Sequence, residues 1–258
     1  MPGDDGAMND QTTAADEIEA IGRDLARSRF RIALSPELEA EYNTKTHAGR
    51  LAMKIRWQLF AVLTNLACLP LDHFAGVLKL GLQARLGVVT PLYLLAALIL
   101  LRGPARLHSA AMAVPLFGFA SSAVFIGFHA SPSDETKYLM ATALLLIFSN
   151  LVVPMSFRQA LVATFGSIAS LFVLLFTIGT VSPDTLGICG FVAAVSLISL
   201  FVRFRSERGL RDTFLLSRQD EIKSQYLVAL SSALAELAET DPLTELPNRR
   251  HLSQELEA

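Results

Sequence analysis

Long apolar runs alternate with short polar stretches over the middle of the chain. Uncharged runs cover residues 57–71, 86–101, 107–133, 138–157, 159–183 and 185–202, and the first continues to about Leu78 with Asp72 as its only charge. A helix needs roughly 20 apolar residues, or about 17 at the shortest, to cross the hydrocarbon core of a bilayer. The pattern therefore predicts six membrane-spanning helices between residues 55 and 202.

The second run is the shortest and lies between Arg85 and Arg102. Long arginine side chains at the end of a spanning helix can extend their charged ends to the membrane surface. We therefore expect both arginines to mark the ends of this span, with their guanidinium groups at the interface.

Charged residues gather at the two ends of the chain. Residues 1–54 hold 17 charged side chains and residues 203–258 hold 18, whereas the 148 residues between them hold only 11. A chain that is 52% hydrophobic and 18% charged, with a mean hydropathy of +0.44, is too apolar for an ordinary soluble domain. Two polar ends thus flank one membrane block.

Net charge and cysteine content exclude two other classes of protein. A net charge of −2 argues against a nucleic-acid partner. Two cysteines, Cys68 and Cys189, cannot build a disulfide framework. The lipid bilayer is the partner that the composition predicts.

Basic residues near the spans predict the orientation, because short cytoplasmic segments are enriched in lysine and arginine. With the N-terminus in the cytoplasm, eleven basic residues lie on the cytoplasmic side and three on the other. The eleven are Lys45, Arg50, Lys54, Arg56, Arg102, Arg106, Arg158, Arg203, Arg205, Arg208 and Arg211, and the three are Lys79, Arg85 and Lys137. We expect both termini in the cytoplasm.

Both polar ends carry helix signals. Ser35, Pro36 and Glu37 offer a cap, a first-turn proline and an acid suited to the helix dipole, so a helix is expected to run from Pro36 into the first span. Residues 203–239 contain no proline, and only Gly209 interrupts good helix formers. One long helix is expected to leave the membrane block there.

Two apolar seams follow this last helix. Leu227, Leu230, Leu234 and Leu237 are spaced 3, 4, 3, which is typical of a left-handed coiled coil. A second seam, Ile222, Tyr226, Ala229 and Ala233, lies on the neighbouring face. The first seam predicts that two copies of the chain pair as a homodimer. The alternative is that this helix stays single and packs on another domain. Use of both seams would give two packings that differ in rotation.

The stretch after this helix, DPLTELPNRR, resembles the opening of the GGDEF domain of diguanylate cyclases. That opening is usually written D-x-L-T-x-L-x-N-R-R, and seven fixed positions agree: Asp241, Leu243, Thr244, Leu246, Asn248, Arg249 and Arg250. Glu245 stands where the family most often has glycine. The resemblance covers residues from about 215 to 258, including the helical linker, and implies a membrane-bound diguanylate cyclase in the bacterial inner membrane.

The resemblance also implies what would follow this opening. The family's α/β catalytic domain joins two GTP molecules into cyclic di-GMP with Mg²⁺, and two GTP-loaded domains must face each other. Its catalytic and metal-binding residues have no counterpart within residues 241–258, so no cofactor and no catalysis is expected of this chain alone. We expect four parts: an N-terminal tail and helix (1–54), a membrane block (55–202), a signalling helix (203–240) and the start of a GGDEF domain (241–258).

The same stretch is also a candidate hinge. Pro242 stops the preceding helix, and Asp241 can cap a new turn. Asn248, Arg249 and Arg250 could bind phosphate. We favour a structural role, in which Asp241 pairs with one of the arginines and sets the angle between helix and domain.

Polar side chains at one end of the block are candidates for sensing a ligand. Asp72 and His73 end the first span, His129 ends the third, and Asp134 and Asp184 lie in the loops of the same side. Asn65 lies deeper in the first span. Histidines and carboxylates could bind a metal ion or titrate with external pH. Their spacing fits no ligand motif, so we favour interfacial side chains that meet water and predict no metal site.

The predicted fold is therefore all-α: a six-helix transmembrane bundle with a cytoplasmic coiled-coil signalling helix. Our leading hypothesis is a dimeric sensor for an unknown small molecule or ion that controls a diguanylate cyclase domain through residues 203–239. Two alternatives stay open. One is a catalytically inactive regulatory partner of an intact cyclase, and the other is a small transporter.

Overall fold

The computed structural model describes residues 18–19, 21–23 and 34–239, and all regular structure in this part of the chain is helical. The chain forms two compact units. The larger unit is Glu41–Glu207, and the smaller one combines residues up to Ala40 with those from Arg208 onward. The predicted membrane block, residues 55–202, lies within the larger unit.

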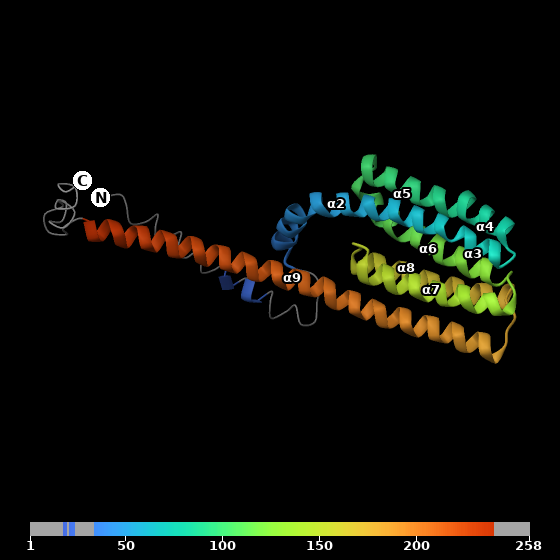
Figure 1. Cartoon of the computed structure of the whole chain (residues 1–258). Helices are drawn as coiled ribbons and strands as arrows, with labels where there is room; N and C mark the ends of the chain where they lie inside the picture. The colour runs from blue at the N-terminus through green and yellow to red at the C-terminus, as the bar shows by residue number, and fades with distance from the viewer. Residues whose placement is uncertain (1–17, 20, 24–33, 240–258) are drawn as a thin grey trace. The chain divides into compact units, whose positions relative to one another are not determined.

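Most helices of Figure 1 belong to the larger unit. In chain order they are α2 (Pro36–Ala67), α3 (Leu69–Phe74), α4 (Leu78–Ala84), the π-helical turn η1 (Arg85–Val89), α5 (Thr90–Arg102), the 3-10 turn η2 (Ala105–Leu107), α6 (His108–Gly127), α7 (Pro132–Val152), α8 (Phe157–Thr177) and α9 (Pro183–Glu239). The ends of α2 and α9 extend into the smaller unit.

Five helical stretches within the described residues are long and apolar enough to cross a membrane, which fits a multi-pass membrane protein. They are Leu78–Arg102, Ala105–Gly127, Pro132–Val152, Phe157–Thr177 and the apolar beginning of Pro183–Ala235. The second predicted span is therefore longer than its 16-residue apolar run suggested. It begins at Leu78 because α4, η1 and α5 follow one another without interruption.

The first predicted span differs from the expectation, because it is not one continuous helix. α2 ends at Ala67, and α3 holds only six residues. Pro70 lies in the first turn of α3, where its missing N–H breaks the hydrogen-bond ladder from α2. After α3, Gly76 takes a φ of 71°, a left-handed conformation that glycine adopts without strain, and α4 begins two residues later.

The core of the larger unit centres on α6, which contacts α5, α7 and α8. One apolar cluster joins Leu100 of α5, Leu116 of α6, Ala163 of α8 and Leu200 of α9. A second cluster joins α6 to α7, α8 and α9, and the buried Cys189 belongs to it. Many large apolar side chains on the outside of the same helices are exposed, as expected for a surface that faces lipid.

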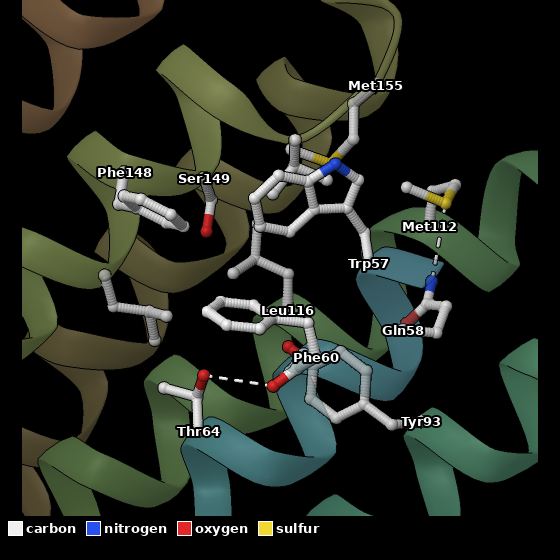
Figure 2. A pocket seen from close by; sticks show the side chains of 13 residues that line it. Trp57, Gln58, Phe60, Thr64, Tyr93, Met112, Leu116, Phe148, Ser149 and Met155 are labelled. Atoms are coloured by element: carbon white, nitrogen blue, oxygen red, sulfur yellow. Dashed lines mark hydrogen bonds between the residues drawn. The ribbon is translucent and has the colours of Figure 1, made fainter. Parts of the chain in front are cut away.

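Two prolines of the predicted spans, Pro115 and Pro154, lie in different kinds of structure. Pro115 lies inside α6 and leaves the carbonyl of Ala111 without its usual donor. Gln58 of α2 donates to that carbonyl at 2.9 Å and also contacts Met112 (Figure 2). Pro154 falls within the apolar run 138–157 that was predicted to span the membrane, but it lies in the loop between α7 and α8.

The expected start of the first helix and the expected continuity of the last helix are confirmed. α2 begins at Pro36, and α9 is one 57-residue helix that passes Gly209 without a break. In the smaller unit, Ile21 and Leu38 are buried together with Leu215 and Ile222 of α9. Arg211 of α9 also donates to both carboxylate oxygens of Glu39.

Candidate functional site

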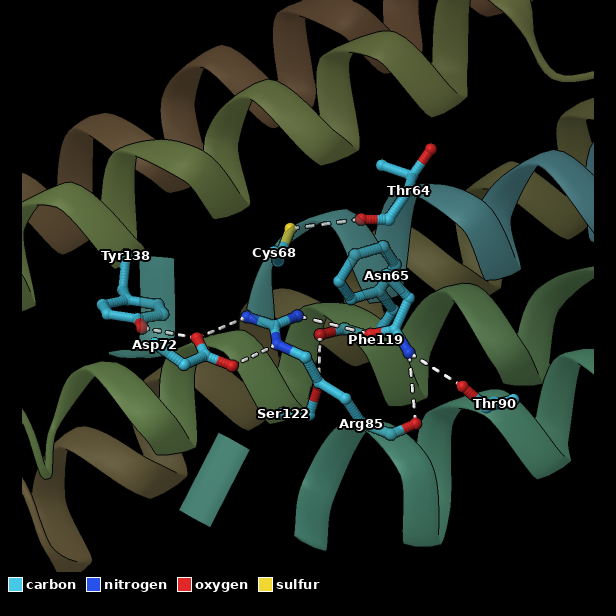
Figure 3. Close-up of polar contacts among 9 residues, drawn as sticks. All are labelled: Thr64, Asn65, Cys68, Asp72, Arg85, Thr90, Phe119, Ser122 and Tyr138. Atoms are coloured by element: carbon cyan, nitrogen blue, oxygen red, sulfur yellow. Dashed lines mark hydrogen bonds and ion pairs between the residues drawn. The ribbon is translucent and has the colours of Figure 1, made fainter. Parts of the chain in front are cut away.

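Four polar side chains meet in the interior of the larger unit (Figure 3). They are Asn65 of α2, Asp72 of α3, Arg85 of turn η1 and Tyr138 of α7, and we call them the polar cluster. Asp72 is 0% exposed and Arg85 is 2% exposed. Charged side chains at membrane depth are costly, so a buried pair of this kind is the first candidate for a functional site.

Arg85 and Asp72 form a two-point ion pair. Nε of Arg85 donates to Oδ2 of Asp72 at 2.6 Å, and Nη2 donates to Oδ1 at 3.0 Å. The planar guanidinium matches the carboxylate in this geometry, which makes both hydrogen bonds strong. The pair is neutral as a whole, and this neutrality lowers the cost of burying both groups.

Asn65 and Tyr138 tie this ion pair to two further helices. The hydroxyl of Tyr138 donates to Oδ1 of Asp72 at 2.6 Å. Oδ1 of Asn65 accepts from Nη1 of Arg85 at 3.3 Å, and its Nδ2 donates to the main-chain carbonyl of Arg85 at 3.1 Å. Nδ2 also donates to the hydroxyl of Thr90 at 3.1 Å. α2 therefore holds both the side chain and the main chain of the π-helical turn.

The π-helical turn has a cause in the sequence. Pro91 has no N–H for the carbonyl of Gly87, and its ring would collide with that carbonyl in a regular α-helix. The wider turn Arg85–Val89 precedes Pro91 and removes the collision. Turns of this kind within α-helices are frequent at functional sites.

Gly81 of α4 lies directly against the polar cluster. A Cβ at this position would come within 2.2 Å of Oδ2 of Asp72. Only glycine leaves room for the buried carboxylate here. The close approach of α3 and α4 therefore depends on this residue.

An apolar groove passes beside the polar cluster, and we call it the α3–α7 groove. Its volume is about 560 Å³, within the range of small-molecule sites. Arg85, Asp134 and Lys137 are the charged residues among those that line it, and Asp134 and Lys137 pair at 2.7 Å. The full lining is Phe60, Thr64, Cys68, Leu71, Phe74, Ala75, Arg85, Phe119, Ala123, Asp134, Lys137, Tyr138, Ala141, Leu144, Leu145 and Phe148.

A smaller pocket has a volume of about 70 Å³ (Figure 2). The two spaces share Phe60, Thr64, Leu145 and Phe148 as lining residues. The small pocket also reaches the C-terminal end of α7, because residues 153 and 155 line it. A line of cavities thus leads from the polar cluster to the loop between α7 and α8.

That loop is attached to α9 by two residues. Nη1 of Arg203 donates to the carbonyl of Val153 at 3.1 Å, and the carboxylate of Glu207 accepts the main-chain N–H of Phe157. The N–H groups of a first helical turn have no partner within the helix, so Glu207 satisfies a group that α8 itself leaves free. These contacts join α7 and α8 to α9 where the apolar part of α9 ends.

Asn150 forms a second polar contact between helices. Its Nδ2 donates to the hydroxyls of Thr164 on α8 and Ser199 on α9, at 3.1 and 2.9 Å. Hydrogen bonds between helices in lipid are modest in energy but fix how the helices meet. α7 and the residue that follows it are therefore linked to α9 at two places, through Ser199 and through Arg203.

The structure separates the residues proposed as ligand sensors. Asp72 is buried in the polar cluster, whereas His73, His129 and Asp184 are exposed. One ring nitrogen of His129 lies 2.8 Å from the carbonyl of Phe125, and Asp134 pairs with Lys137 at the groove. No group of three or more histidine, cysteine or carboxylate side chains suited to a metal ion occurs among the described residues.

Two members of the polar cluster were not anticipated from the sequence. Arg85 was expected at the membrane interface, and the structure corrects this, because its side chain is buried against Asp72. Tyr138 carried no sequence signal beyond its place at the start of an apolar run. Asn65 and Asp72 did carry a signal, since each interrupts an apolar stretch.

The first coiled-coil seam is exposed on α9. Leu227 is 62% exposed, Leu230 39% and Leu234 58%, while the side chain of Leu237 lies outside the described residues. The second seam is partly covered, because Ile222 is only 5% exposed and contacts the N-terminal residues. The hinge candidates Asp241, Pro242, Asn248, Arg249 and Arg250 lie outside the described residues.

No protein-family model, curated protein or solved structure matches this chain. The resemblance of residues 241–250 to the GGDEF opening therefore rests on those ten residues alone. The class that the structure defines is an all-helical protein, in which the described residues form five long apolar helices that fit a multi-pass membrane protein.

Proposed function

We propose that this chain is the membrane signal-input and transmission part of a diguanylate cyclase. One observation carries the proposal. α9 is a single helix from Pro183 in the apolar block to Glu239, and DPLTELPNRR begins two residues later. A continuous helix between a membrane bundle and the opening of a catalytic domain is suited to transmit a change of rotation or spacing.

The proposed topology has six crossings and both termini in the cytoplasm of a bacterium. α2 has 32 residues, but its uncharged part begins only at Trp57, so we propose that this part and α3 together supply the first crossing. Lys45, Arg50, Lys54 and Arg56 precede this crossing, and Arg203 and Arg205 follow the last one. An even number of crossings is required if all these basic residues are to lie on the cytoplasmic side.

Dimerisation is proposed to occur through the first seam of α9. Leu227, Leu230 and Leu234 present a free apolar stripe, and the N-terminal residues Ile21 and Leu38 already cover Ile222 of the second seam. A helix pair on the first seam would bring two catalytic domains together, each with GTP and Mg²⁺. A change to the second seam would require the N-terminal residues to leave Ile222.

The polar cluster is proposed as the part that responds to the signal. It ties α2, α3 and the π-helical turn to α7, and α7 is tied to α9 through Val153 and Arg203. A stimulus that moves α7 would therefore act on α9. The stimulus is proposed to be a small molecule, which the groove beside the cluster could hold.

Production of cyclic di-GMP is the direct test. The coding region is read beyond Ala258, and its whole product is purified in detergent and given GTP with Mg²⁺. The proposal expects cyclic di-GMP from the wild type and much less from a variant with Leu227→Asp and Leu230→Asp. An intact frame without activity would contradict it, and a stop codon directly after Ala258 would favour an inactive regulatory partner instead.

A further inference from the structure

We propose that the α3–α7 groove binds a single-chain lipid with a neutral carbonyl head, such as a long-chain acyl amide, ester or lactone. The head accepts hydrogen bonds from Arg85, and the acyl chain follows α7 towards Phe148. Binding itself needs no catalytic domain. Only its role as the signal rests on the function proposed above.

The length of the groove fits one acyl chain. Its lining residues on α7 run from Asp134 to Phe148, fourteen helical steps, or roughly 21 Å at 1.5 Å per residue. Between Tyr138 and Phe148 the distance along the helix is about 15 Å, half the thickness of the hydrocarbon core. The walls along this stretch are apolar, with Ala141, Leu144 and Leu145 on α7.

The polar end of the groove fits a neutral head. Arg85 has five N–H groups, and three of them donate to Asp72 and Asn65. The others have no hydrogen-bond partner among the described residues, and Arg85 lines the groove. Because Asp72 already balances the charge of Arg85, a second carboxylate would be repelled, whereas a carbonyl oxygen adds a hydrogen bond without adding charge.

The depth of the polar cluster argues against a bilayer phospholipid as the occupant. Tyr138 lies six residues into α7, roughly 9 Å along the helix from Pro132. A phosphate group placed beside it would leave the water of the interface at a high cost. A neutral carbonyl can move to this depth, because Arg85 replaces its hydrogen bond to water.

A second groove provides an internal comparison. It has a volume of about 670 Å³ and is lined by residues of α4, η1, α5, α6 and α8, including Val88, Val114, Phe117 and Leu174. None of its lining residues is charged. The proposal therefore expects selective binding in the α3–α7 groove and only ordinary contact with lipid in the second one.

Photolabelling in lipid nanodiscs tests the proposal. The whole chain is reconstituted in phosphatidylcholine and exposed to a dodecanoyl amide that carries a photoreactive diazirine in its chain. We expect labelled peptides from α3 and α7. Labelling should fall roughly tenfold in Ala141→Trp and in Leu144→Trp, which fill the groove, and stay unchanged in Val114→Trp, which fills the second groove.

Competition by unlabelled compounds tests whether the site prefers a neutral carbonyl head. Unlabelled dodecanoyl amide is expected to compete roughly tenfold better than either dodecane or dodecanoate, and this preference is expected to disappear in Arg85→Met. Equal labelling in Ala141→Trp and wild type, or equal competition by dodecane, would overturn the proposal. Retention of phosphatidylcholine at the labelled site, seen by native mass spectrometry and not displaced by the amide, would also overturn it.

This assay uses no GTP, so the two proposals fail separately. Loss of selective labelling would leave the diguanylate cyclase role standing. Absence of cyclic di-GMP would leave the lipid site standing.

Discussion

Asp72 and Arg85 carry opposite charges at a buried place where neither charge could stay alone. Each satisfies the other, and Asn65 and Tyr138 use part of their remaining hydrogen-bonding capacity. Removal of one partner from a buried ion pair leaves an uncompensated charge, which costs far more than replacement of both by apolar groups. We therefore expect a single substitution in the ion pair to be more damaging than a double one.

The variant Arg85→Met should destabilise the larger unit by roughly 3–5 kcal/mol, because Asp72 loses its counter-charge. The double variant Asp72→Leu with Arg85→Met should recover most of this loss. Unfolding in detergent, followed by circular dichroism, measures both. A single variant as stable as the wild type would contradict the buried ion pair.

Two glycines of one continuous helical stretch give a matched comparison. Gly81→Ala should destabilise the fold by about 1–3 kcal/mol, because the new Cβ collides with Asp72. Gly87→Ala should be neutral or stabilising, since no atom outside its own helix lies within 4 Å of the added Cβ. Thermal unfolding measures the stability of both variants. An equal change in stability would argue against the close approach of α3 and α4.

Sequence reasoning identified half of the polar cluster. Asn65 and Asp72 stand out because each interrupts an apolar run. Arg85 does not, because a charge at the edge of an apolar run usually marks an interface. Its pairing with Asp72 depends on the chain reversal at Gly76 and on the π-helical turn, and both depend on packing that periodicity does not reveal.

At the scale of helices, strong local signals predicted the start of α2 and the continuity of α9. Proline at the first position set the start of α2 at Pro36, and good helix formers carried α9 through Gly209. The prediction of the first span as a single helix was wrong. The apolar run is continuous in the sequence, but the helix breaks before Pro70. Pro154 was misplaced because the apolar run continues through the loop after α7.

The N-terminal residues should control access to the second seam of α9. In a chain with Ile222→Cys, the thiol should react slowly with a maleimide, because this position is buried by Ile21 and Leu38. Adding Ile21→Asp should raise the rate roughly tenfold by opening this contact. Leu227→Cys, on the exposed seam, is the control and should react quickly in both backgrounds.

A reactive Ile222→Cys in the otherwise unchanged chain would show that the second seam is free. The N-terminal residues would then have no part in choosing between the seams. The wild-type length of the chain is kept in all these variants, so differences in rate report the local contact.

At the scale of the whole molecule, labelling from outside the cell tests the number of crossings. In intact cells, a membrane-impermeant maleimide should label Ser133→Cys, and should label Thr44→Cys and Ser206→Cys only after the membrane is opened. This result requires α2 and α3 to cross the bilayer together. Labelling of Thr44→Cys in intact cells would leave five crossings and place the two ends of the block on opposite sides.

The central claim is that two copies of this chain pair along α9 and carry a signal from the membrane block. Disulfide cross-linking in native membranes tests it most directly, with single cysteines at positions 226–234 in a background of Cys68→Ser and Cys189→Ser. The account predicts dimers that peak at positions 227, 230 and 234 and are weak at position 228, where Val228 lies outside the seam. Monomers at every position would contradict the account.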